Sequence, residues 1–83
     1  MKYRGKHEIY QAMLETCNDS LGANRTRIMY GAELSWGQVQ DYMDSVINKG
    51  LIEERKKRYF LTQKGRETLN ILIDLHELLH DGP

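Results

Sequence analysis

The segment His-Glu-Leu-Leu-His at residues 76–80 has the spacing of a zinc-binding helix. Positions i and i+4 share a helix face, so His76 and His80 could ligate zinc while Glu77 activates a metal-bound water. A peptidase of this type needs a third protein ligand, and only three residues follow. We therefore predict no catalysis, no metal and no cofactor. A non-catalytic metal site formed by paired histidines of two subunits is the alternative.

The charges of the 83-residue chain sum to zero but are unevenly distributed. Residues 55–66 contain six cationic and no acidic side chains, whereas residues 33–54 contain one lysine and five acids. The first 32 residues carry a net charge of +2, and residues 67–83 carry −4. This pattern predicts one concentrated cationic site despite overall neutrality.

Length and cysteine content restrict the class of protein. A chain of 83 residues forms one domain, 1–83, too small for a deep cleft between two lobes. The single cysteine, Cys17, excludes an internal disulfide, and its helical spacing from Ile9 and Met13 favours a packed thiol over a nucleophile. No leader or membrane-spanning run is apparent, so we expect a soluble cytoplasmic protein. We predict no small-molecule ligand.

Two helices are predicted in the first third of the chain. Apolar residues recur at helical spacing from about His7 to Asn18, and a polar stretch ends that helix. Asn24 is a good N-cap for a short second helix, Arg25 to Tyr30, which Gly31 should stop.

The strongest helix start is at Ser35. The Ser35 hydroxyl can cap the amide of Gln38 while the Gln38 side chain returns to Ser35, which is a capping box. The helix should end near Gly50, in the left-handed conformation of a C-terminal cap. The short glycine-containing turn before it predicts a helix-turn-helix over about residues 24–49.

After Gly50 the pattern changes from helical to extended. Residues 51–62 predict a two-stranded hairpin, or wing, with a charged tip from Glu53 to Arg58 and no glycine to specify its turn. Thr62 can cap a fourth helix over about residues 63–80. The fold class is therefore mainly α with a small β-hairpin, in the order α-α-α-β-β-α of a winged helix-turn-helix.

Three stretches of the chain match a known pattern: TRIMYGAELS at 26–35, NKGLI at 48–52 and YFLTQKG at 59–65. They resemble the archaeal winged helix-turn-helix family of small chromatin-associated and regulator-like DNA-binding proteins. The likeness covers nearly the whole chain; its first stretch is fairly specific, whereas the other two occur in many winged helices. The resemblance implies binding of double-stranded DNA, no catalysis, and dimerisation through the last helix. A nucleoid-associated location would follow.

The candidate DNA-binding residues lie in three places. Cations and a hydroxyl at the start of the second helix, and the cations of the hairpin tip, suit phosphates. The start of the third helix suits base edges in the major groove. The candidates are Arg25, Thr26, Arg27, Ser35, Trp36, Gln38, Gln40, Arg55, Lys56, Lys57 and Arg58. For a charge run on an isolated hairpin the alternative is a solvated turn, and attachment to a helix-turn-helix favours DNA contact.

The third helix is acidic where members of the resembled family often carry lysines. Val39 and Met43 should face inward, which leaves Gly37, Gln40, Asp41, Asp44 and Ser45 outward. A carboxylate can accept a hydrogen bond from cytosine, but it also repels phosphates. For Trp36 we favour a core or boundary position over DNA contact. The alternative function is therefore a protein-interaction module whose acidic helix faces a basic partner.

The fourth helix predicts a homodimer. One stripe, comprising Leu69, Leu72, Ile73, His76, Leu79 and His80, should cover the domain's own core. A second stripe of Ile71, Leu75 and Leu78 widens the apolar arc to roughly 220°, about twice what a surface helix needs. A second copy would cover this stripe and supply two DNA-binding units. Otherwise it would lie against the first helix.

Overall fold

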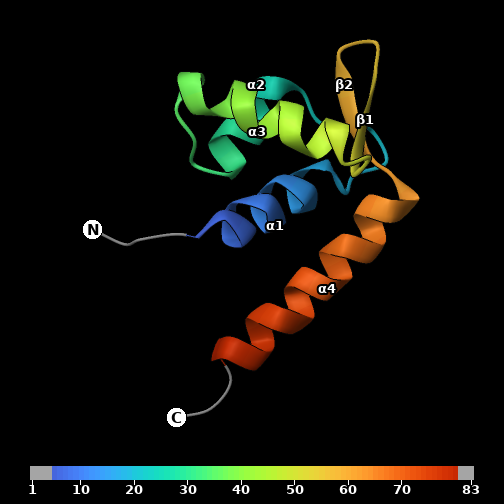
Figure 1. The fold of residues 1–83 in the computed structure, drawn as a ribbon. Coiled ribbons are helices and arrows are strands. Elements are labelled where there is room, and N and C mark those ends of the chain that lie inside the picture. Colours follow the sequence, from blue (N-terminus) through green and yellow to red (C-terminus); the bar gives the residue numbers. More distant parts are fainter. Residues whose placement is uncertain (1–4, 81–83) are drawn as a thin grey trace.

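The computed structural model describes residues 5–80 and contains four helices and one antiparallel hairpin (Figure 1). The element order confirms the predicted α-α-α-β-β-α fold class. The elements are α1 (Lys6–Cys17), α2 (Arg25–Gly31), α3 (Trp36–Asn48), β1 (Ile52–Arg55), β2 (Arg58–Leu61) and α4 (Gln63–His80).

The core lies where α1 packs against α2, β2 and the first half of α4. Three apolar side chains of α1, from Met13, Leu14 and Cys17, are almost wholly buried. The predicted packing of Cys17 is therefore confirmed. From the other elements the core includes Ile28, Val39, Met43, Val46, Leu51, Ile52, Tyr59, Leu61 and Leu69.

Local side-chain caps start the two helices of the helix-turn-helix. The Asn24 side chain accepts a hydrogen bond from the Arg27 amide, and the predicted Ser35–Gln38 capping box is present. The sequence predicts that α2 ends at Tyr30, before Gly31. In the structure Gly31 is itself the last helical residue, so the helix is one residue longer than predicted. The place of Gly31 is explained by packing, since a Cβ there would collide with the Thr16 hydroxyl of α1. The left-handed residue of the turn is Glu33, with φ of 56°.

The hairpin pairs over its whole length, from Ile52 opposite Leu61 to Arg55 opposite Arg58. Its loop therefore consists of two residues, Lys56 and Lys57, with φ of 52° and 64°. Positive φ at both central positions defines a type I′ turn, whose twist matches that of the paired strands. The predicted charged tip is thus smaller than expected.

α4 begins at Gln63, directly after Thr62, and its later turns project away from the other elements (Figure 1). The Thr62 hydroxyl accepts a hydrogen bond from the Gly65 amide at 2.9 Å and donates one to the Gly50 carbonyl at 2.6 Å. Leu69 is buried, and Leu72 and Ile73 pack on the core. Leu79 is 64% exposed, so the prediction that its stripe covers the core to the helix end is wrong. The last turns of α4 extend beyond the layer they were expected to cover.

Candidate nucleic-acid interface

The outer face of α3 is exposed and carries no cation. Gly37, Gln40, Asp41 and Asp44 are exposed as predicted, whereas Ser45 is half-buried and lies 2.9 Å from the Tyr10 hydroxyl. The favoured core or boundary position of Trp36 is wrong, because its side chain is 64% exposed. Trp36 is the first residue of α3, and the buried side of this helix is formed by later residues, Val39, Met43 and Val46. The indole is therefore available to an external partner.

The predicted site residues at the start of α3 are partly occupied by the helix cap. Ser35 Oγ accepts from the Gln38 amide at 3.1 Å, and Gln38 Oε1 accepts from the Ser35 amide at 2.9 Å. These bonds use acceptor oxygens and leave the Gln38 side-chain NH₂ as a donor. Gln38 can therefore cap the helix and still contact an acceptor outside it.

One turn further along α3, Gln40 and Asp44 form a pair. The Gln40 side-chain nitrogen donates to an Asp44 carboxylate oxygen at 3.0 Å. A glutamine must use both its donor and its acceptor to recognise adenine in the major groove. The Gln40 NH₂ has a second N–H donor, so the side chain keeps one donor and its carbonyl oxygen for a base while Asp44 fixes its orientation.

The cations of α2 do not all point away from the protein. Arg27 Nη1 donates to Asp19 Oδ2 at 3.4 Å, although both side chains are partly solvated. The Leu21 amide, and secondarily the Arg27 guanidinium, hold the pKa of Asp19 below its ordinary value. Arg25 is half-buried and Thr26 is exposed. Asp19 thus offsets part of the charge that the sequence places at this helix.

The four cations of the hairpin divide into two kinds. Lys56 and Lys57 are exposed at the tip. Arg55 lies 3.1 Å from a Glu53 carboxylate oxygen, and its guanidinium carbon is 4.0 Å from the Phe60 ring centre. Arg58 turns back toward the body of the protein: its Nε donates to the Leu21 carbonyl at 2.7 Å and its Nη2 to the Gly22 carbonyl at 3.2 Å. Two of the four predicted contacts therefore already have partners within the chain.

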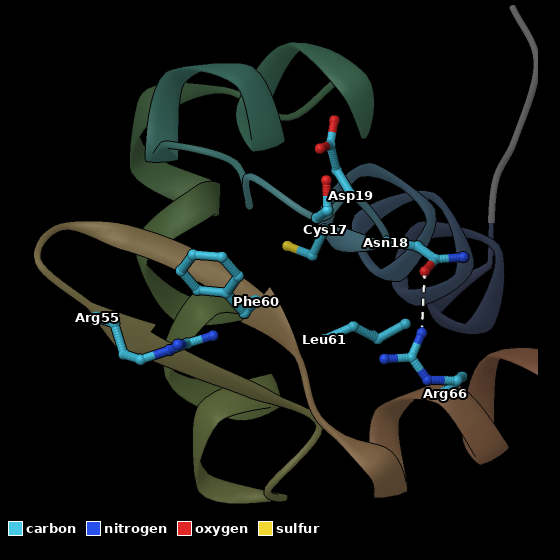
Figure 2. A pocket seen from close by; sticks show the side chains of 8 residues that line it. Cys17, Asn18, Asp19, Arg55, Phe60, Leu61 and Arg66 are labelled. Atoms are coloured by element: carbon cyan, nitrogen blue, oxygen red, sulfur yellow. Dashed lines mark hydrogen bonds between the residues drawn. The ribbon is translucent and has the colours of Figure 1, made fainter.

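A pocket of about 370 Å³ lies between the end of α1, the hairpin and the first turn of α4 (Figure 2). Figure 2 shows Phe60 and Leu61 at the pocket with Cys17, while Arg66 donates to Asn18 Oδ1 across it at 3.2 Å. Burial raises the pKa of Cys17 to about 12, so its thiol is protonated and unreactive at neutral pH. The Arg66 contact joins the first turns of α4 to the end of α1.

The histidine motif lies on the exposed end of α4. His76 is half-buried, and the side chain of His80 is outside the described part of the structure. Among the side chains that are described, no three histidine, cysteine or acidic groups come together as a metal site. The described helices also include none that is long and apolar enough to cross a membrane.

The predicted second stripe of α4 is uncovered in the single chain. Ile71 is 65% exposed, Leu75 39% and Leu78 75%. Leu79 extends this apolar surface at the same end of the helix. Three other apolar side chains are exposed among the described residues and were not identified from the sequence: Leu21 in the loop after α1, Tyr30 near the end of α2 and Ile47 near the end of α3.

Comparison with known proteins supports this architecture over most of the chain. A family described as winged helix-turn-helix matches residues 3–80. Uncharacterized protein MJ0287 of Methanocaldococcus jannaschii is 36% identical over 59 residues, which are 71% of this chain but only 61% of that relative. The crystal structure of Sso10a-2, a DNA-binding protein from Sulfolobus solfataricus, matches with a TM-score of 0.79 and 25% identity. That match covers 94% of this chain and 84% of the other.

Proposed function

Because the chain belongs to the winged helix-turn-helix family, we propose that it binds double-stranded DNA and performs no catalysis. The observation that carries the proposal is the match to an archaeal DNA-binding protein, combined with an exposed α3 and a cationic hairpin. α3 enters the major groove, and the hairpin contacts the backbone beside it. A role in transcription or in DNA packaging on the nucleoid would use the same contacts.

α3 supplies discrimination rather than attraction. Its outer face offers an amide at Gln40 and carboxylates at Asp41 and Asp44, which can address adenine and cytosine. The carboxylates repel the backbone of any duplex, so only a site with compensating base contacts is favoured. We therefore expect modest affinity and a preference among sequences.

Gly37 supports close approach of α3 to a partner. It is exposed in the first turn, and a Cβ built on it would meet nothing within 4 Å. A glycine inside a helix costs about 0.5–1 kcal/mol relative to alanine, and no contact within the described chain explains it. An external surface pressed against the α3 backbone would explain it.

The hairpin and α2 supply the part of binding that does not depend on sequence. Among the described cations of α2 and the hairpin, Lys56, Lys57 and Arg25 form no hydrogen bond or ion pair within the chain, and each can neutralise a phosphate. Such contacts release counterions, so affinity should fall as salt rises.

We further propose a homodimer joined through α4. A second copy would cover Ile71, Leu75 and Leu78 and would supply a second α3. We propose an antiparallel arrangement of the two α4 helices, as the family resemblance implies.

Two measurements test these proposals. Fluorescence anisotropy on a mixed-sequence duplex should show binding that weakens steeply between about 50 and 200 mM salt. Light scattering should give the mass of a dimer, and Leu75→Glu with Leu78→Glu should shift it to a monomer and weaken DNA binding. Salt-independent or absent binding would overturn the DNA proposal, and a monomeric parent at tens of micromolar would overturn the dimer.

A protein-interaction role is the second candidate. It is favoured by Trp36 and Tyr30, which are exposed at the two ends of the turn that joins α2 and α3, beside the acidic face of α3. A basic protein partner would use this surface in place of DNA. Absent DNA binding, together with a partner whose capture is lost in Trp36→Ala, would favour this role.

A further inference from the structure

Arg58 makes the side-chain hydrogen bonds between the hairpin and the loop that joins α1 to α2. It opens β2, yet its guanidinium reaches residues 36 and 37 positions earlier in the chain. Two N–H groups of the fork donate to adjacent carbonyls, of Leu21 at 2.7 Å and Gly22 at 3.2 Å. Both distances are those of good hydrogen bonds to backbone acceptors.

The same loop is joined to β2 by its backbone. Ala23 and Tyr59 exchange two hydrogen bonds, at 2.9 and 2.8 Å, and form an antiparallel bridge. Gly22 has φ of 72°, and a Cβ on it would collide with the Phe60 ring and the Tyr59 carbonyl. The loop and β2 are therefore closely packed, and α2 with α3 follows directly from the loop.

Arg58 is adjacent in sequence to the lysine tip. Lys56 and Lys57 form the two-residue turn, and Arg55 pairs with Arg58 at its base. A two-stranded hairpin is only marginally stable by itself, so the contacts that its strands make with the rest of the protein determine where its turn lies. Any force that fixes Arg58 also fixes the position of the lysines relative to α3.

We propose that Arg58 is a positioning residue of the DNA interface and not one of its phosphate ligands. Its guanidinium ties the hairpin to the loop of residues 21–23 and so holds Lys56 and Lys57 where they reach the backbone beside α3. This role rests on the proposed DNA binding. Lysine cannot replace it, because an ammonium on a flexible stem lacks the planar fork that bonds both carbonyls.

A double-mutant cycle on a mixed-sequence duplex of about 20 base pairs tests this role. The variants are Arg58→Ala, Arg58→Lys, the pair Lys56→Ala with Lys57→Ala, and that pair combined with each Arg58 change. Arg58→Lys keeps the charge, so it should weaken binding almost as much as Arg58→Ala, by about threefold or more. Removing the lysines should then cost less in either Arg58 background than in the parent.

Two outcomes would overturn the inference while DNA binding stands. Parental affinity in Arg58→Lys with weak binding in Arg58→Ala would show that only the charge matters, as in a phosphate contact. Additive losses would show that Arg58 and the lysines act independently. A parent that binds no duplex would remove the proposed function and this inference together.

Amide hydrogen exchange of the DNA-free protein gives a second readout. Both Arg58 variants should exchange the Ala23 and Tyr59 amides faster, while the core amides of Met13 and Val46 keep their parental rates. Lys6→Ala, at the start of α1, is the control for loss of an exposed cation. Unchanged exchange at Ala23 and Tyr59 in Arg58→Ala would overturn the tie, and faster exchange of every amide would mean general destabilisation instead.

Discussion

The two surfaces that we propose to face DNA, the outer face of α3 and the hairpin, differ in charge and in how their side chains are held. On α3 the exposed groups are acids, amides and an indole, and their hydrogen bonds join residues three or four positions apart. On the hairpin they are cations, and Arg58 is held by carbonyls 36 and 37 positions earlier in the chain. Attraction to DNA and choice among sequences are thus assigned to different elements, which neutral net charge conceals.

The strongest test of this division removes the hairpin charge. Replacing Arg55, Lys56, Lys57 and Arg58 by alanine should weaken binding by roughly 10–100-fold on every duplex alike, because phosphate contacts carry no sequence information. The slope of log affinity against log salt should lose about two, from the two lysines. Titrations at several salt concentrations measure both, with Lys6→Ala as the control. A loss near four would make both arginines phosphate ligands, and no loss would make the hairpin a solvated turn.

A test of the core beneath both surfaces uses pH. The thiol of Cys17 has its pKa raised from 9.0 to about 12 in the folded protein, so its stabilising effect is complete below pH 9 and is lost as pH rises toward 12. The free energy of unfolding should fall by up to about 1.4 kcal/mol per pH unit in that range. Urea unfolding from pH 8 to 10.5 measures it. Cys17→Ala should be less stable at pH 8 and fall less steeply above pH 9; equal slopes would contradict the assignment.

Neutralising α3 tests the other side of the comparison. Asp41→Asn with Asp44→Asn removes two charges that repel phosphates, so affinity should rise by about threefold to tenfold on all duplexes. The preference among sequences should shrink at the same time. Competition between a selected and a random duplex measures both, and Glu15→Gln on α1 is the matched control. Unchanged affinity would place this face of α3 away from DNA.

The smallest expected effect concerns Gly37. Gly37→Ala should raise the free energy of unfolding by about 0.5–1 kcal/mol, because alanine favours the helix and its Cβ meets nothing. It should nevertheless weaken duplex binding by keeping the α3 backbone away from DNA. Asn70→Ala, exposed on α4, is the control that should stabilise without affecting binding. Parental affinity in Gly37→Ala would show that α3 is not approached closely at this point.

Prediction from sequence succeeded where the signal is local. The Asn24 and Ser35 caps depend on residues three positions apart, and both are formed as expected. The type I′ turn was not predicted, since lysines rather than Asn-Gly occupy its positive-φ positions. The Arg58 contact was also missed, because nothing in the sequence near Arg58 indicates a partner in a loop 36 residues away.

Helix periodicity shows which face of a helix is apolar, but it does not show where the covering layer ends. In α4, Leu79 lies on the same apolar stripe as the buried Leu69 and was therefore expected to be covered. It is exposed because the rest of the fold does not extend as far as the end of this helix. Periodicity is equally weak at a first helical residue such as Trp36. The remaining site assignments depend on charge patterning. That pattern locates the cations, but it does not show which of them form hydrogen bonds or ion pairs within the chain.

The length of α4 has a consequence for the geometry of the DNA target. Its 18 residues span about 27 Å, and only the first half packs on the domain. If two copies pair along the exposed half, the helix acts as a ruler between two α3 helices. Seven extra residues between the domain and the paired segment would preserve the phase of the apolar stripe and lengthen each copy's helix by about 10.5 Å, so the two α3 helices of an antiparallel pair would move apart by about 21 Å, close to six base pairs. The spacing between half-sites would then be set by helix length, independently of the residues that contact bases.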